Sequence, residues 1–243
     1  MNQIQITLTP AESKRIIAMG VKKLPVIQQA LKKGIILITL GATNAYVAEE
    51  LTGRKIDHVR YGAGYIDGTT AVVPIDTRLP TIALRDGKQV KDDGIIKEMG
   101  ARDVVIKGAN ALDPQGVAGV MMANPQGGTT GSILGAVMAR GVNLVIPVGI
   151  EKSIPYSVVE LSKRIGIQRC SKATGLPVGV MPLCGTVVTE VQALTLLGAE
   201  DVFPIGAGGI NGGEGSVTLC VTGDKADEIF ELVQKVKEKK GEF

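Results

Sequence analysis

The sequence contains few aromatic residues, one histidine and three cysteines. Aromatic residues make up 3% of the chain and tryptophan is absent, which disfavours a protein that binds nucleic acid by stacking bases on aromatic side chains. Zinc sites combine several Cys and His residues, whereas His58 is the only histidine and Cys170, Cys184 and Cys220 stand far apart. We therefore expect no metal. An odd number of cysteines without a C-x-x-C pair indicates a reducing compartment.

A basic cluster and a long apolar run are also missing. The chain has 27 Lys and Arg against 24 Asp and Glu, and its only dense group of lysines lies at 235–240. Proteins that bind a phosphate backbone show a basic patch or stripe. No apolar run reaches the roughly 18 residues of a membrane span, and the N-terminal residues lack the pattern of a signal peptide. We expect a cytoplasmic protein that binds neither nucleic acid nor a membrane.

Glycine, in contrast, is abundant. It accounts for 32 of the 243 residues, whereas average usage is about 7%. Because glycine lacks a Cβ, it allows a ligand or a second backbone to approach closely. The remaining composition, with 44% hydrophobic and 21% charged residues, is that of an ordinary globular protein. The length fits one large α/β domain or a main domain with a smaller one.

A unit of strand, glycine turn and helix recurs along the first two thirds of the chain. Residues 35–40 form a continuous apolar run, followed by Gly41 and a helical pattern at 44–51. Residues 103–107 and 143–148 repeat the apolar run. Continuous apolarity indicates strands that are buried on both faces, as in a parallel sheet covered by helices. We predict an α/β fold with a Rossmann-like, mainly parallel sheet and helices on both faces.

The flanking segments predict the rest of the architecture. Thr9 and Glu12 have the spacing of a capping box, which starts a helix. Short segments between 58 and 90, with a turn at Asp86-Gly87, indicate an antiparallel hairpin at a sheet edge. After residue 177 the order strand, helix, strand, strand, helix, with a glycine loop at 206–215, is most of a split βαβ unit. We predict a ligand-binding domain at 1–165 and a smaller α/β lobe at 166–243.

Polar, glycine-rich turns follow the predicted strands, and ligands of open α/β sheets bind at the carboxyl ends of strands. N–H groups at a helix start attract anions, and a lysine on an apolar strand must place its ammonium in water or against an anion. The same turns can be interpreted as helix caps or tight connections. The candidate binding residues are Gly41, Thr43, Asn44, Lys107, Gly108, Asn110, Gly127, Gly128, Thr129, Thr130 and Lys152.

Carboxylates near these turns are candidates for moving a proton between carbon atoms. In order of preference they are Asp113, Asp67 and Glu151. Lys107 or Lys152 would stabilise the oxyanion that develops. Each carboxylate also has a purely structural interpretation, as a turn residue or a surface ion pair. The 206–215 loop leads into a strand, whereas the dinucleotide fingerprint needs a helix there, so no nicotinamide site is predicted at this loop.

Several of these motifs resemble a known group of enzymes. Residues 34–43, with Glu50-Leu51 closing the helix, resemble the opening of the ribose-5-phosphate isomerase, glucosamine-6-phosphate deaminase and CoA-transferase group. Residues 106–112 resemble the lysine-bearing turn of the isomerases. The pattern from Lys107 to Lys152 is similar to methylthioribose-1-phosphate isomerases and initiation-factor regulatory subunits. The resemblance covers residues 24–155. It implies a Rossmann-like sheet, a phosphorylated sugar or nucleotide-like ligand and no redox cofactor.

The sequence departs from these families at three places. The 41–44 turn lacks the second glycine and the serine of the isomerase phosphate turn, and the 67–70 segment lacks the second acidic residue of the isomerase motif. Asn110 stands at the position where, by this resemblance, the methylthioribose-1-phosphate isomerases have a catalytic aspartate. These differences weaken the case for isomerase chemistry and leave the case for phosphate binding intact.

Three functional hypotheses follow. The first is a cofactor-independent enzyme acting on a small phosphorylated metabolite, with aldose–ketose isomerisation as the most concrete reaction. The second is a ligand-sensing or regulatory protein that keeps the anion-binding turns but lacks the catalytic acid–base pair. The third is a CoA-linked acyl transferase with a carboxylate nucleophile. A homo-oligomer is expected, because closed homo-oligomers are the common case.

Overall fold

The computed structural model describes residues 2–238 of the chain. Its helices are α1 (Pro10–Lys23), α2 (Pro25–Lys32), α3 (Ala42–Thr52), α4 (Gly128–Arg140), α5 (Val158–Arg164), α6 (Glu190–Leu196) and α7 (Ala226–Glu238), with 3-10 turns η1 (Ile95–Lys97), η2 (Ile150–Lys152) and η3 (Ile167–Arg169). Its strands are β1 (Gln3–Leu8), β2 (Ile35–Ile38), β3 (Gly64–Asp67), β4 (Thr69–Val72), β5 (Ile82–Arg85), β6 (Lys88–Val90), β7 (Val104–Ile106), β8 (Ala111–Leu112), β9 (Ala118–Met122), β10 (Asn143–Pro147), β11 (Gly179–Leu183), β12 (Thr186–Val188), β13 (Asp201–Gly208) and β14 (Ser216–Thr222).

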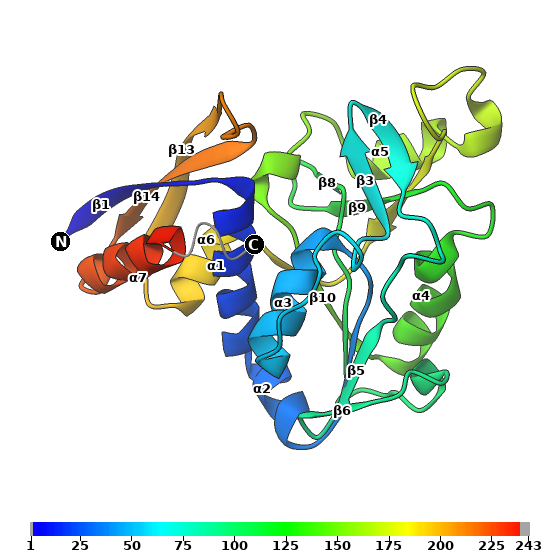
Figure 1. Cartoon of the computed structure of the whole chain (residues 1–243), viewed down its shortest axis with the longest axis horizontal. Coiled ribbons are helices and arrows are strands. Elements are labelled where there is room, and N and C mark those ends of the chain that lie inside the picture. The colour runs from blue at the N-terminus through cyan, green and yellow to red at the C-terminus, as the bar shows by residue number, and fades with distance from the viewer. Residues whose placement is uncertain (1, 239–243) are drawn as a thin grey trace.

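A six-stranded mixed sheet forms the centre of an α/β fold (Figure 1). Its strand order is β12-β10-β7-β2-β5-β6. The first four strands are parallel to one another, and β5 and β6 are antiparallel to their neighbours. The predicted hairpin at Asp86-Gly87 is confirmed, and both residues have positive φ, 50° and 75°, as a tight two-residue hairpin turn requires.

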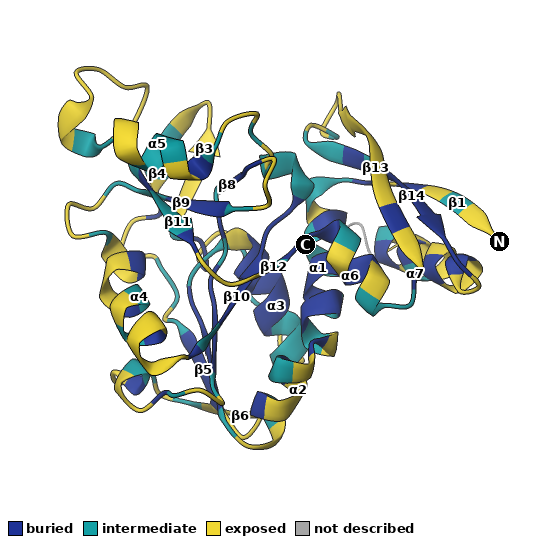
Figure 2. Cartoon of the chain, turned by 180° about the vertical axis from the view of Figure 1, so that it is seen from behind, coloured by how far each residue is buried: buried dark blue, intermediate teal, exposed yellow. Residues whose placement is uncertain are grey.

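The central strands are apolar throughout because both faces of the sheet are covered. Ile36 and Ile38 of β2 pack into a core with α1, α2, α3 and α6. Ile35 and Leu37 point to the opposite face and pack with α4 and η1. Figure 2 shows the resulting dark band of buried residues through the central strands and α1 and α3. The continuous apolar run at 35–38 is thus explained by burial on both sides.

The start of α1 follows the predicted capping box. The Thr9 side chain accepts from the Glu12 N–H, and the Glu12 carboxylate accepts from the Thr9 N–H at 2.8 Å. Pro10 occupies the first turn, where its missing N–H has no intrahelical role. Pro25 then begins α2 only two residues after α1 ends.

A second, three-stranded sheet of order β1-β14-β13 stands beside the main sheet, with α7 against it (Figure 1). β1 pairs antiparallel with β14, so residues from both ends of the chain share one sheet. β12, in turn, joins the main sheet by pairing in parallel with β10. The division into 1–165 and 166–243 stays a prediction, and the strand pairing crosses it in both directions.

Two small antiparallel units lie where β2, β7 and β10 end. One is the sheet β11-β9-β8 and the other is the hairpin β3–β4. Both contribute to the wall of the cavity described below. Among residues 2–238, no helix combines the length and the apolar character needed to cross a bilayer.

Candidate functional site

A cavity of about 780 Å³ opens at the carboxyl ends of β2 and β7, with Lys152 of η2, which follows β10, in its wall. The tertiary structure brings four segments that are far apart in the sequence to this one place. Asn44 is fully buried beside it. The other predicted binding residues all line the cavity, namely Gly41, Thr43, Lys107, Gly108, Asn110, Gly127, Gly128, Thr129, Thr130 and Lys152.

The start of α3 forms one wall and carries no side-chain cap. Gly41 is the N-cap residue, and no side chain accepts from the first-turn N–H groups. Neither Thr43 nor Asn44 caps this helix, so the interpretation of the 41–44 turn as a side-chain cap is wrong. The Asn44 amide instead donates to the Thr39 carbonyl at 2.8 Å. Thr43 is 2% exposed and its Oγ1 has no partner, which is costly for a buried hydroxyl unless a ligand uses it.

The start of α4 faces the same cavity and is also uncapped. Gly127 and Gly128 have φ of 78° and 54°, a conformation that glycine adopts far more readily than other residues. The N–H groups of the first turn have no intrahelical acceptor, and no side chain caps them. Two helix starts, each with a partial positive charge, therefore line one cavity.

Lys107 and Lys152 add positive charge at the cavity floor. Lys107 is 8% exposed, and its Nζ is 3.4 Å from the Gly108 carbonyl oxygen. Burial, with a contribution from the nearby Lys152 charge, lowers the pKa of Lys107 from 10.5 to about 8. Lys152 donates to the Ala109 carbonyl at 3.1 Å. Burial also lowers the pKa of Lys152, against the opposing charges of Glu151 and Glu190.

The charge of the lining has one sign. Lys14 of α1 and Arg78, which precedes β5, join the two lysines, and no Asp or Glu is among the described residues that line the cavity. Lys14 and Arg78 were not predicted from the sequence, since a basic residue in a surface helix or a loop carries no local signal of facing a cavity. A low-dielectric cavity lined by cations concentrates anionic ligands.

Asp113 and Asp67 lie outside the cavity. Asp113 is buried, and its carboxylate accepts from the N–H groups of Gln115 at 2.9 Å, Val117 at 2.8 Å and Val158 at 3.0 Å. These contacts stabilise its own loop and the start of α5. Asp67 is exposed at the end of β3, where it precedes Gly68 with φ of 63°. Both positions match the turn interpretation of these residues.

Glu151 also lies outside the lining, next to Lys152 in η2. Glu190, which sequence reasoning missed, is fully buried at the start of α6 and accepts from the Ile150 N–H at 2.9 Å. Burial raises the pKa of the Glu190 carboxyl, and the charge of Glu151 adds to this. The capping box at Thr189 marks the helix start, but it does not reveal that Glu190 points inward.

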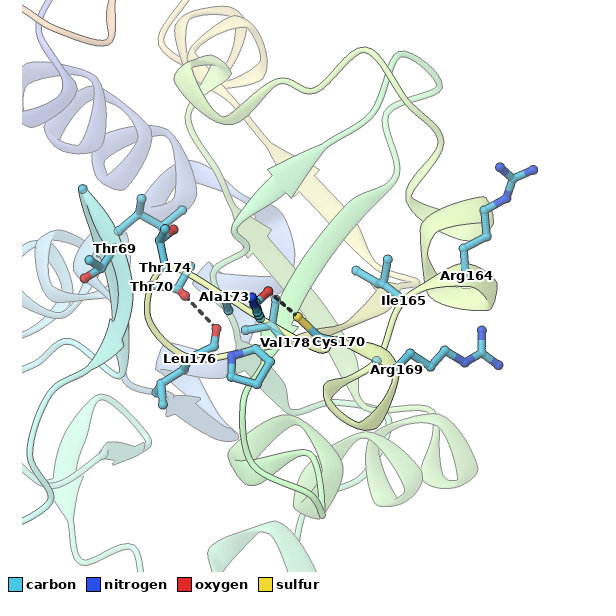
Figure 3. Close-up of a pocket in the computed structure, with 15 residues that line it drawn as sticks. Thr69, Thr70, Arg164, Ile165, Arg169, Cys170, Ala173, Thr174, Leu176 and Val178 are labelled. Atoms are coloured by element: carbon cyan, nitrogen blue, oxygen red, sulfur yellow. Dashed lines mark hydrogen bonds between the residues drawn. The ribbon is translucent and has the colours of Figure 1, made fainter.

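A second cavity, of about 650 Å³, adjoins the first between β4 and residues 164–178 (Figure 3). The Thr70 hydroxyl donates to the Leu176 carbonyl at 2.7 Å, and this contact belongs to the wall between the two cavities. Arg164, Arg169 and Lys172 are among its lining residues, and in Figure 3 the Arg164 and Arg169 side chains extend away from the Thr70–Leu176 contact. The two helix starts without side-chain caps, in contrast, line the first cavity.

Within residues 2–238, no three His, Cys, Asp or Glu side chains are arranged so that they could hold a metal ion.

The comparisons with known proteins place the chain in no family. The resemblance to the ribose-5-phosphate isomerase group stays a prediction. No family model matches the chain, and no curated protein matches it.

Proposed function

We propose that the cavity binds a small phosphorylated metabolite, either a sugar phosphate or a nucleotide-like molecule. One observation carries this proposal. Two uncapped helix starts and four cationic side chains line one cavity, and no carboxylate is among the described lining residues. A phosphate group carries up to two negative charges and several acceptor oxygens, which match free N–H groups and ammonium groups better than a neutral ligand does.

The reaction we favour is a cofactor-independent isomerisation of a sugar phosphate. Of the predicted catalytic residues, Lys107 lines the cavity, whereas Asp113, Asp67 and Glu151 do not. We therefore assign the proton transfers to Lys107 and Lys152. The ammonium of one lysine stabilises the carbonyl oxygen, and the neutral amine of the other accepts a carbon-bound proton. A Rossmann-like interpretation of the sheet supports a ligand at this edge.

A ligand-sensing protein is the second candidate. It is favoured by the position of the three carboxylates outside the cavity lining, since an acid–base pair of the predicted kind is not assembled there. The acyl-transferase hypothesis has less support, because its carboxylate nucleophile would have to face the ligand. A homo-oligomer remains part of either proposal.

Thermal stability measured with a panel of ligands tests the binding proposal. At 100 times its dissociation constant, a ligand adds about 2.7 kcal/mol to the free energy of unfolding. We expect ribose 5-phosphate or glycerol 3-phosphate to raise the melting temperature, and free ribose or glycerol to leave it unchanged. The exposed Lys88 at the far edge of the sheet provides a control, because Lys88→Met should retain the response. Equal responses to phosphorylated and unphosphorylated sugars would contradict phosphate recognition. Turnover of the stabilising ligand then separates the enzyme from the sensor.

Glycines of α4 provide a matched test of the anion cradle. A Cβ on Gly131 would collide with the Gln126 carbonyl oxygen, whereas a Cβ on Gly135 meets open space. We expect Gly131→Ala to displace the 126–130 turn and to weaken binding of the stabilising phosphate ligand at least about tenfold, or about 1.4 kcal/mol. Gly135→Ala should keep the affinity and add about 0.5–1 kcal/mol of stability through helix propensity. Isothermal titration calorimetry on both variants measures the difference, and unchanged affinity in Gly131→Ala would rule out this cradle.

A further inference from the structure

We infer that Lys107 reacts covalently with the ligand, its amine adding to an aldehyde or ketone carbon to form an imine. This inference rests on the proposed function, because the phosphate group is what holds the carbonyl carbon in the cavity. It narrows the ligand to phosphorylated compounds with a free carbonyl, such as open-chain sugar phosphates.

The position of Lys107 favours contact with the carbon chain of the ligand. Lys107 directly follows β7, which lies between β2 and β10 in the sheet. The turn at Gly41 follows β2, and Lys152 follows β10. Since neighbouring strands are about 4.8 Å apart, a phosphate at the start of α3 leaves the next carbon atoms of a short ligand above Lys107.

The amine of Lys107 is not engaged by a carboxylate. Its described hydrogen bond is the 3.4 Å contact to the Gly108 carbonyl oxygen, and no ion pair involving it is found within residues 2–238. The other charged groups that line the cavity are Lys152 from η2, Lys14 from α1 and Arg78 from the segment before β5, and all three are cations. Glu151 and Glu190 act on Lys152 and do not line the cavity.

This environment keeps a useful fraction of the amine neutral near physiological pH. Burial and the neighbouring Lys152 lower the pKa of Lys107 to about 8, whereas an exposed lysine titrates near 10.4. A buried lysine beside a second cation is a recognised arrangement for an amine nucleophile. A lysine that served only as a phosphate partner would gain nothing from the neutral form.

The reaction balances with the groups at hand. The neutral Lys107 nitrogen attacks the carbonyl carbon, the C=O π bond breaks, and the amine proton moves to the oxygen to give a carbinolamine. The Lys152 ammonium then donates a proton to the hydroxyl, which leaves as water while the C=N bond forms. The products are a protonated imine on Lys107 and one water molecule. Neutral Lys152 can next accept the proton from the adjacent carbon.

Reductive trapping tests the imine. The full-length chain is incubated at pH 8 with glyceraldehyde 3-phosphate and sodium cyanoborohydride, and modified lysines are located by peptide mass spectrometry. We expect Lys107 to be modified at least about tenfold faster than the exposed Lys88, and we expect glycerol 3-phosphate, which lacks a carbonyl, to protect it.

Two controls test the specificity of this reaction. Unphosphorylated glyceraldehyde should modify Lys107 at least about tenfold more slowly than glyceraldehyde 3-phosphate does. Lys152→Met should also slow the modification at pH 7.5, because the Lys152 charge contributes to the lowered pKa of Lys107 and its removal reduces the neutral fraction of the amine.

The outcomes separate this inference from the function on which it rests. If glycerol 3-phosphate raises the melting temperature but Lys107 is not trapped, the imine is wrong and phosphate binding stands. If Lys107 is trapped equally by both aldehydes and is not protected, its reaction is non-specific and the imine inference is overturned. If glycerol 3-phosphate neither raises the melting temperature nor protects Lys107, the proposed function itself fails. Lys88→Met, which lies outside the cavity lining, should retain both the thermal response and the trapped product at Lys107.

Discussion

Replacing Lys107 with methionine is expected to raise the free energy of unfolding at pH 7 by up to about 3 kcal/mol while abolishing the response to phosphate ligands. The native environment lowers the pKa of Lys107 from 10.5 to about 8, and one pKa unit corresponds to about 1.4 kcal/mol. Burying the charged ammonium therefore destabilises the folded protein. Methionine has a similar length and no charge, so it does not carry this free-energy cost. Urea denaturation of both proteins measures the difference.

The pH dependence of this difference has a definite sign. Below pH 8 Lys107 is charged in both the folded and the unfolded state, and the full penalty is present. Between about pH 8 and 10.5 the unfolded state binds more protons than the folded state, so the stability of the native protein rises relative to the variant. The advantage of Lys107→Met should therefore disappear by about pH 10.5.

Lys88→Met is the control for Lys107→Met, because Lys88 is exposed in β6. Its effect should stay within about 0.5 kcal/mol at every pH. A loss of stability in Lys107→Met at pH 7 would mean that the ammonium has a stabilising partner in the folded protein.

Replacing Asp113 with alanine should cost about 2–4 kcal/mol, because one of its three hydrogen bonds is buried and two are part-buried; this is a large part of the stability of an ordinary domain. Its carboxylate accepts from the N–H groups of Gln115, Val117 and Val158. Each buried donor left without an acceptor costs about 1–3 kcal/mol, more where the lost partner is charged. Chemical denaturation should show this loss directly, together with weaker hydrogen-exchange protection at the start of α5.

Asp67→Ala provides the same substitution at an exposed position and should change the stability by less than about 1 kcal/mol. The comparison also separates structure from chemistry. If Asp113→Ala kept its stability but lost turnover of a sugar phosphate, Asp113 would be catalytic, as the sequence first suggested. Loss of stability in Asp113→Ala, with turnover retained in the fraction that stays folded, would leave the chemistry to the two lysines.

The local sequence determined most of the elements. The capping box at Thr9 and Glu12 began α1, the apolar run at 35–38 formed a strand covered on both faces, and Asp86-Gly87 made the hairpin turn. These features depend on interactions between residues that are close in the chain, or on a burial pattern that can be read along it. The glycine turns after the strands can also be predicted from the local sequence, because a sharp turn favours glycine wherever the segment lies in the fold.

Only the tertiary structure decided which charged groups meet. Asp113 and Lys107 both follow strands, yet one turns inward to backbone N–H groups and the other lines the cavity. Lys14 reaches the cavity because α1 packs against α3 and α6, and Glu190 is buried because α6 packs on α1. β1 joins β14 across more than two hundred residues. The glycines and lysines of the candidate site could be chosen from the sequence, but the direction of a side chain depends on what packs behind it, and that is a property of contacts between distant segments.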